Sequence, residues 1–115
     1  MHEASLMENL LTIAEESLSG YNVTKINCLT IKAGRLANIL PDALVFAFQS
    51  LAEAPFAGAR LEIEVLPITA RCLDCGAEYQ SMDIPLVCPD CGSNMAAIIS
   101  GSEVYLDSID FEQEE

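Results

Sequence analysis

Apolar residues recur near the start of the chain at the spacing of an amphipathic α-helix. The stripe consists of Leu6, Leu10, Ile13 and Leu18, beside Met7, Leu11 and Ala14. Ser5 and Glu8 have the spacing of a capping box, in which two side chains bind the first N–H groups of a helix. Gly20 follows the stripe, and glycine is the residue type that most often ends a helix. We therefore expect a helix from about Leu6 to Ser19, preceded by a short free end over residues 1–4.

Two further segments have the patterns of β-strands. Residues 23–32 are rich in valine, isoleucine and threonine and precede Gly34, so this run predicts a first strand. Between Leu61 and Val65 apolar residues alternate with glutamates, and Pro67 follows. That alternation predicts a second, half-buried strand that the proline ends.

The remaining periodic segments predict a second helix and a last strand. Pro41 suits the first turn of a helix, where the N–H that proline lacks has no helical partner. The inner stripe of this helix is Leu44, Phe48 and Leu51. A last strand is expected from Val104 to Phe111. Its apolar positions change phase between Leu106 and Ile109, which indicates a bulge.

The predicted order is helix, strand, helix, strand, insert, strand. Three strands and two helices pack as one pair of layers, so the expected fold class is α+β. We expect a small three-stranded sheet with two helices, plus an inserted zinc-ribbon-like module with four cysteines. Residues 1–69 and 99–115 would form the α+β domain, and residues 70–98 would form the module.

Composition narrows the range of partners. The 115 residues suit one domain with a small appendage. Eighteen acidic and five basic residues give a formal net charge of −13, which argues against nucleic acid and anionic membranes, because both require a cationic surface. No apolar run approaches the roughly 20 residues of a membrane span. The acidic start lacks the basic region of a secretory signal, so we expect a cytoplasmic protein.

Four of the five cysteines form two copies of one short motif, Cys72-Leu-Asp-Cys75-Gly and Cys88-Pro-Asp-Cys91-Gly. In such a motif both sulfurs reach one ion while the backbone turns, and the glycine takes the positive φ that the turn requires. We expect the glycine N–H to point at a thiolate. Four thiolates in a tetrahedral array suit Zn(II), so the cysteines are predicted to hold a structural zinc ion with no open position.

Two other chemistries fit the cysteine spacing. Similar motifs bind a single iron in rubredoxin-like sites, and the colour of the purified protein would distinguish iron from zinc. Two disulfides, or four buried thiols, are the other alternative, and a reducing compartment disfavours the disulfides. Cys28 stands apart within the first predicted strand, where we expect it to be a small buried hydrophobe.

The single histidine is His2. Read alone, a histidine at a chain end is most often a solvated residue without a role. The positions nevertheless offer a chelate. The Met1 amine and the His2 amide nitrogen close a five-membered ring with a metal, and the His2 amide and imidazole Nδ1 close a six-membered ring. The Glu3 amide nitrogen or carboxylate can complete a planar set, which Ni(II) and Cu(II) favour.

The start MHEASLMENLL, the pair CLDCG and CPDCG, and the ending GSEVYLDSIDFE together resemble the HypA/HybF family of hydrogenase-maturation nickel metallochaperones. The resemblance covers essentially the whole chain. It implies that transferable Ni(II) is bound by Met1, His2 and Glu3. It implies that structural Zn(II) is bound by Cys72, Cys75, Cys88 and Cys91. Nickel then belongs to the domain of residues 1–69 and 99–115, and zinc to the module of residues 70–98.

The resemblance also implies a carrier rather than an enzyme, which passes nickel toward the large subunit of a [NiFe] hydrogenase together with the GTPase HypB. The alternative is a zinc-ribbon protein–protein interaction module without nickel transfer.

Two features depart from the family pattern. Related chains often have Gly-Glu-Leu where this one has Gly34-Arg35-Leu36. No second histidine is available from the zinc region, so backbone, carboxylate, water or a partner's group must complete the nickel set.

Overall fold

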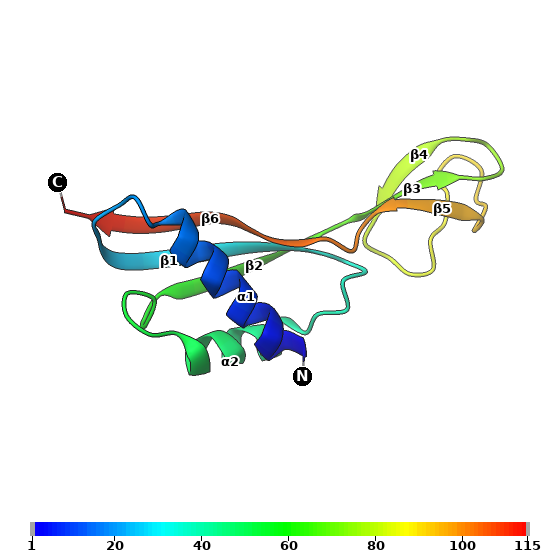
Figure 1. Cartoon of the computed structure of the whole chain (residues 1–115). Helices are drawn as coiled ribbons and strands as arrows, with labels where there is room; N and C mark the ends of the chain where they lie inside the picture. The colour runs from blue at the N-terminus through cyan, green and yellow to red at the C-terminus, as the bar shows by residue number, and fades with distance from the viewer. Residues whose placement is uncertain (1, 115) are drawn as a thin grey trace. The chain divides into compact units, whose positions relative to one another are not determined.

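A computed structural model describes residues 2–114, with His2 described by its backbone alone. Over those residues the chain forms two helices and six strands (Figure 1). The elements are α1 (His2–Ser17), β1 (Val23–Gly34), α2 (Pro41–Leu51), β2 (Arg60–Leu66), β3 (Ile68–Cys72), β4 (Glu78–Ser81), β5 (Ala96–Ser100) and β6 (Val104–Gln113). The strands form two three-stranded sheets, in the orders β2-β1-β6 and β4-β3-β5. Neither helix is long and apolar enough to cross a membrane.

The chain divides into two compact units. The first takes in the chain up to Lys32, then Ile39–Glu64, and the chain from Tyr105 onward. The second comprises Ala33–Asn38 and Val65–Val104. The expected α+β class is confirmed, because two helices accompany a small three-stranded sheet and a four-cysteine module is added to them. The assignment of separate functions to the two predicted domains stays a prediction.

The first unit is built around α1, β1 and α2. Within the first unit, the buried apolar side chains of these three elements are Met7, Leu10, Leu11, Ala14, Ile26, Cys28, Leu29, Ile31, Leu44, Ala47 and Phe48. Cys28 is thus buried, as expected, and α1 contacts α2 directly. Lys32 lies on the central strand β1. Its Nζ is 4.0 Å from Oε1 of Glu64 on β2 and 3.8 Å from Oδ1 of Asp107 on β6. Such cross-strand pairs of opposite charge support the sheet order.

α1 begins earlier than the sequence indicated. The predicted free end over residues 1–4 is wrong for the described residues, because α1 starts at His2. The capping box predicted one turn later is therefore wrong too. Glu3, in the first turn, is only 8% exposed, and its Oε2 accepts a hydrogen bond from the backbone N–H of Leu40. This contact comes from a distant part of the chain, so local capping signals did not reveal it.

The second unit contains a small sheet that the sequence did not predict. β3 is its central strand and pairs antiparallel with β4 and with β5. The pairing with β5 shifts register between Thr69 and Ala70. β4 has four residues and β5 has five, too few for a clear alternation of apolar and polar positions. The buried cluster of this sheet contains Ala70, Cys72, Tyr79 and Cys88, with the partly buried Ala77, Leu86 and Ala96 packed against it, so its own apolar core is small.

The last strand shows the change of phase that the sequence indicated. In β6 the partly buried residues are first Val104 and Leu106, and then Ile109 and Phe111. The side chains that face inward therefore switch parity near Asp107. The bulge inferred from this switch stays a prediction.

Gly34 lies where two backbone segments of the second unit meet. Its N–H donates to the carbonyl of Glu103 at 2.7 Å, and the N–H of Leu36 donates to the carbonyl of Gly101 at 2.7 Å. A Cβ at Gly34 would overlap the backbone of Gly101. We expect Gly34→Ala to lower the free energy of unfolding by about 2 kcal/mol or more, as overpacking against fixed atoms does. Urea denaturation measures the loss.

Gly20→Ala is the matched control for this prediction. A Cβ at Gly20 meets no atom within 4 Å, so the variant should be neutral or slightly stabilising through its stiffer unfolded chain. Equal losses in the two variants would show that the close approach at Gly34 is not what requires glycine.

Candidate metal centre

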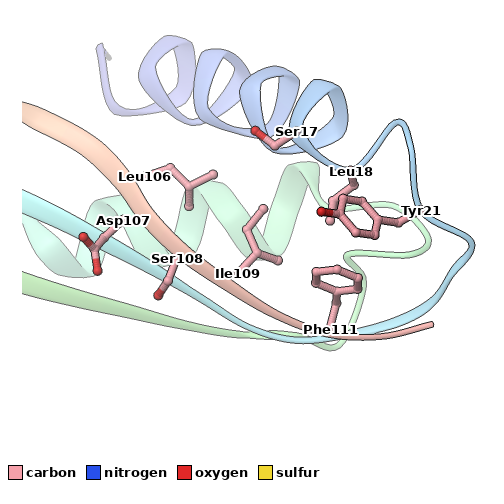
Figure 2. A pocket seen from close by; sticks show the side chains of 8 residues that line it. All are labelled: Ser17, Leu18, Tyr21, Leu106, Asp107, Ser108, Ile109 and Phe111. Atoms are coloured by element: carbon pink, nitrogen blue, oxygen red, sulfur yellow. The ribbon is translucent and has the colours of Figure 1, made fainter.

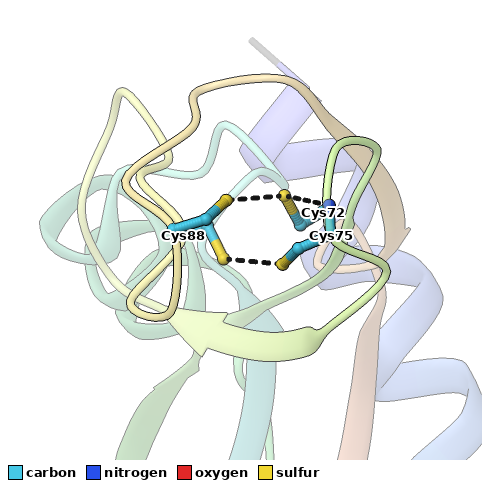
Figure 3. A group of neighbouring side chains, drawn as sticks. Cys72, Cys75 and Cys88 are labelled. Atoms are coloured by element: carbon cyan, nitrogen blue, oxygen red, sulfur yellow. Dashed lines mark hydrogen bonds between the residues drawn. The ribbon is translucent and has the colours of Figure 1, made fainter.

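The four cysteines of the two repeated motifs converge on one point of the second unit, and Figure 3 labels three of them, Cys72, Cys75 and Cys88. Cys72 ends β3, and the other three lie in the loops on either side of β4. All four sulfur atoms lie within 4.8 Å of one another. Cys72 Sγ is 3.5 Å from Cys91 Sγ, and Cys75 Sγ is 3.6 Å from Cys88 Sγ. A tetrahedral ion with metal–sulfur bonds of about 2.3 Å spaces its sulfurs about 3.8 Å apart, so the arrangement fits zinc.

Two nearly identical turns carry the cysteine pairs. The N–H of Gly76 donates to the carbonyl of Cys72, and that of Gly92 donates to the carbonyl of Cys88, each at 2.9 Å. Both glycines have positive φ, 79° and 77°, as predicted for turns that favour glycine. The expectation that the glycine N–H faces a thiolate is wrong, because it closes the turn instead. The N–H of Cys75 faces a sulfur, donating to Cys72 Sγ at 3.4 Å.

The thiols of this cluster differ in how easily they ionise. The backbone N–H of Cys75 is the largest influence on Cys72 and lowers its pKa to about 6. The backbone at Ser93 favours the thiolate of Cys91, but hydrogen bonds with the other thiols and burial outweigh it and raise the pKa of Cys91 to about 12. Like charges that share a site resist full ionisation. A divalent cation is what allows all four sulfurs to be thiolates at neutral pH.

The coordination that this cluster offers is closed. Among the residues that the structure describes, the four cysteines are the one group of three or more histidine, cysteine or acidic side chains placed to hold a metal ion. Cys72 and Cys88 are buried, whereas Cys75 and Cys91 are exposed. With sulfur at all four positions, none remains for water or a substrate. The site is suited to holding the fold rather than to chemistry.

The residues predicted to bind nickel lie at the start of α1. Met1 and the side chain of His2 lie outside the described part of the chain, so their roles stay predictions. Glu3 is described, and its carboxylate does not join the cysteines, which belong to the other unit. Its Oε2 lies 3.5 Å from the backbone nitrogen of Leu40. The described end of α1 is therefore held against the start of α2.

A hollow of about 250 Å³ in the first unit lies between the end of α1 and β6 (Figure 2). It is lined by Ser17, Leu18, Tyr21, Leu106, Asp107, Ser108, Ile109 and Phe111. The rings of Tyr21 and Phe111 meet edge to face, with centroids 5.3 Å apart and planes at 70°, a favourable arrangement for aromatic rings. The lining supplies one carboxylate and neither imidazole nor thiol, so it does not resemble a nickel or zinc site.

The fold and the cysteine cluster define the class of this chain as a small α+β protein with an added four-cysteine metal module. A family model described as hydrogenase/urease nickel incorporation, metallochaperone, HypA, matches residues 1–111. The chain belongs to this HypA family of nickel-incorporation metallochaperones, whose members serve hydrogenase maturation. The resemblance noted in the sequence is thereby confirmed.

Individual relatives match over nearly their whole length. The hydrogenase maturation factor HypA of Moorella thermoacetica is 39% identical over 108 residues, which cover 93% of this chain and 96% of that protein. The protein of the same name from Desulfitobacterium hafniense is 36% identical over 114 residues, covering 98% and 100%. A solution structure of a HypA protein matches with a TM-score of 0.69 at 25% identity, covering 99% of this chain and 98% of that one. The nickel metallochaperone HypA from Helicobacter pylori shares the fold, with a TM-score of 0.66 at 24% identity over 97% and 98% of the two chains.

Proposed function

We propose that this chain is a nickel carrier, which binds Ni(II) at its amino terminus and delivers it for the maturation of a [NiFe] hydrogenase. The observation that carries the proposal is membership of a nickel-incorporation family in a chain whose matched region opens with Met1-His2-Glu3. Nickel is the cargo. The resident ion is a structural zinc held by the four thiolates of Cys72, Cys75, Cys88 and Cys91.

The proposed nickel site is a planar chelate. The Met1 amine, the His2 amide nitrogen and the His2 imidazole supply three nitrogens, and the Glu3 carboxylate is the candidate for the fourth donor. Ni(II) accepts planar nitrogen ligation. The deprotonated His2 amide would cancel one of the two positive charges of the ion. A lowered charge suits the start of α1, because the positive end of a helix dipole opposes a bound cation.

The start of a helix also suits a site that must release its ion. The i→i−4 ladder of an α-helix does not use the first N–H groups. A metal bound to nitrogens at the beginning of α1 therefore leaves the ladder of that helix intact. Nickel can leave by stepwise exchange of ligands, and neither core has to open for the transfer.

The proposed partners are the GTPase HypB and the large subunit of the hydrogenase. Family membership links the chain to hydrogenase maturation, and the net charge of −13 favours basic protein surfaces over nucleic acid or membranes. We propose that the carrier acts in the cytoplasm, where thiols stay reduced. It would act by ligand exchange and not as an enzyme.

A blocked amine tests the proposal. The test compares nickel titrations of two proteins. One has a free Met1 amine, and the other carries four extra residues, Gly-Ser-Gly-Ser, before Met1. A one-residue extension is avoided, because it would place histidine third from the new terminus and create another planar chelator. The extended protein should bind nickel more than about a hundredfold less tightly, beyond the range for losing an outer-shell partner, and keep one zinc per chain. Equal binding would instead favour a zinc-ribbon interaction module without nickel transfer.

Nickel affinity is expected to rise with pH. Imidazole binds metals as the neutral base, and loading releases protons from imidazole and the His2 amide. Ordinary imidazole has a pKa of about 6.5. The affinity for nickel should therefore fall at least about tenfold for each pH unit below 6. Competition titrations between pH 5 and 8, with zinc content checked at each pH, measure the change. A constant affinity over this range would contradict imidazole ligation.

A further inference from the structure

We propose that the first unit has a docking surface for an extended segment of a partner protein, in which a basic side chain lies between apolar ones. The surface is a furrow that crosses the end of α1, bounded by Glu15, Leu18, Tyr21, Phe56 and the edge strand β6. The inference goes beyond the proposed nickel site, which lies at the start of α1, and its test uses no nickel.

Three hollows of the first unit share walls and form this furrow. The hollow of about 250 Å³ in Figure 2 shares Leu18 and Tyr21 with a second hollow of about 300 Å³. The second hollow shares Glu15, Pro55 and Phe56 with a third of about 140 Å³. All the residues that line them belong to the first unit. Hollows that share walls in this way suit successive side chains of one peptide.

The floor of the furrow is apolar and one of its walls is an exposed aromatic ring. Leu18 and Phe56 are buried, at 8% and 4% exposure, whereas Tyr21 is 52% exposed. The edge-to-face contact with Phe111 holds the ring of Tyr21 in place. A docked segment would remove the open part of this ring from water. Tyrosine is among the residue types that contribute most to binding at protein interfaces.

The position of β6 favours an extended occupant. β6 lies at one edge of the sheet β2-β1-β6, and no other strand of the described residues pairs with its outer side. Four consecutive β6 residues, Leu106 to Ile109, line the hollow of Figure 2. Successive side chains of a strand point to opposite faces, so a hollow confined to one face would be lined by alternate residues. This hollow therefore reaches the edge, where extended peptides add as a further strand.

The charge around the furrow favours a basic occupant. Glu15 and Glu53 line it and are exposed, and neither forms an ion pair within residues 2–114. α1 and α2 end beside it, at Ser17 and Leu51, without a basic residue in either last turn. The negative ends of two helix dipoles thus add to the two carboxylates. A lysine or arginine would meet this charge while its aliphatic stem lies on the apolar floor.

A blocked basic peptide, acetyl-Leu-Arg-Leu-Arg-Leu-amide, tests the surface. Its control is acetyl-Leu-Glu-Leu-Glu-Leu-amide. Each is titrated into zinc-loaded, nickel-free protein and followed by the NMR signals of the backbone amides. The basic peptide should shift the amides of Tyr21 and Ser108 in a saturable manner, and the acidic peptide should not. Binding by neither peptide, or shifts only at residues outside the furrow, would overturn the inference.

Two pairs of variants separate the furrow from general attraction to an acidic chain. Glu15→Lys should weaken binding of the basic peptide by about fivefold or more. Glu16→Lys makes the same change of charge at the neighbouring exposed residue, which does not line the furrow, and should stay within about twofold of wild type. Tyr21→Ala should lose about tenfold, whereas Tyr105→Ala, at a 40% exposed tyrosine of β6 outside the furrow, should stay within about twofold.

Equal losses within either pair would show that no furrow is recognised and would overturn the inference. Shifts of the Tyr21 and Ser108 amides when the protein alone is concentrated would show that a second copy covers the furrow, and would overturn it as well. A failed nickel titration would sink the proposed carrier function and leave these peptide results unaffected.

Discussion

Replacing His2 by glutamine is expected to weaken nickel binding by more than about a hundredfold, beyond the range for losing an outer-shell partner of a metal site. The imidazole of His2 is the only one in the chain. Without it the six-membered chelate ring cannot form, and a planar nitrogen set cannot close. Competition with a chelator of known affinity measures the loss. Zinc content should stay at one ion per chain, because the four cysteines lie in the other unit.

Glutamine is preferred to alanine at this position. A small second residue exposes Met1 to removal by aminopeptidase, which would shift the terminal amine and confuse the two effects. Asn9→Gln is the matched control, since Asn9 is exposed on the same helix and should bind nickel as the wild type does. Full-strength nickel binding by His2→Gln would exclude the amino-terminal site.

Loss of zinc is expected to unfold the sheet β4-β3-β5. Cys72 and Cys88 supply two of the four residues in its buried cluster, and Ile98 and Ile99 on β5 are about half exposed, at 51% and 47%. Structural zinc contributes about 10–16 kcal/mol of binding free energy in small zinc-folded peptides, far more than a core of this size supplies. Cys88→Ser should therefore lose zinc, and amide protection in β3 should fall by more than about a hundredfold.

Cys28→Ala is the control for that experiment. Cys28 is a buried thiol of the first unit, so its removal should leave one zinc per chain and full protection in β3. Undiminished protection of β3 in zinc-free protein would contradict a structural role for the ion. A red colour in the purified protein would show that ferric iron, and not zinc, occupies the same four-sulfur site.

The features predicted well from the sequence are those encoded by neighbouring residues. The start of α2 at Pro41 and most of the apolar stripe of α1 follow from local backbone chemistry and local periodicity. Ile13 was placed in that stripe wrongly, because it is 47% exposed. The four-cysteine cluster was likewise predicted from neighbouring residues. Each Cys-x-x-Cys-Gly motif forms its own turn, as the positive φ of Gly76 and Gly92 shows, and two such turns need only meet to complete a tetrahedral site.

The features that the sequence did not reveal depend on residues far apart in the chain. α1 starts at His2, and Glu3 in its first turn accepts from Leu40, 37 positions away. The unusual Arg35 donates from Nε to the carbonyl of Met82 at 3.1 Å, a contact without any sequence signal. The direction of each glycine N–H was also mispredicted. A motif spacing shows that a turn exists, but it does not show which of two nearby acceptors, carbonyl or sulfur, a given N–H will reach.

X-ray absorption at the nickel and zinc edges, on protein loaded with one ion of each, tests most directly whether the chain has two separate metal sites. We expect zinc to be surrounded by four sulfurs at about 2.3 Å, and nickel to be surrounded by nitrogen and oxygen alone. A sulfur neighbour of nickel, or nitrogen in the first shell of zinc, would contradict a transferable ion at Met1-His2-Glu3 and a structural ion at the four cysteines.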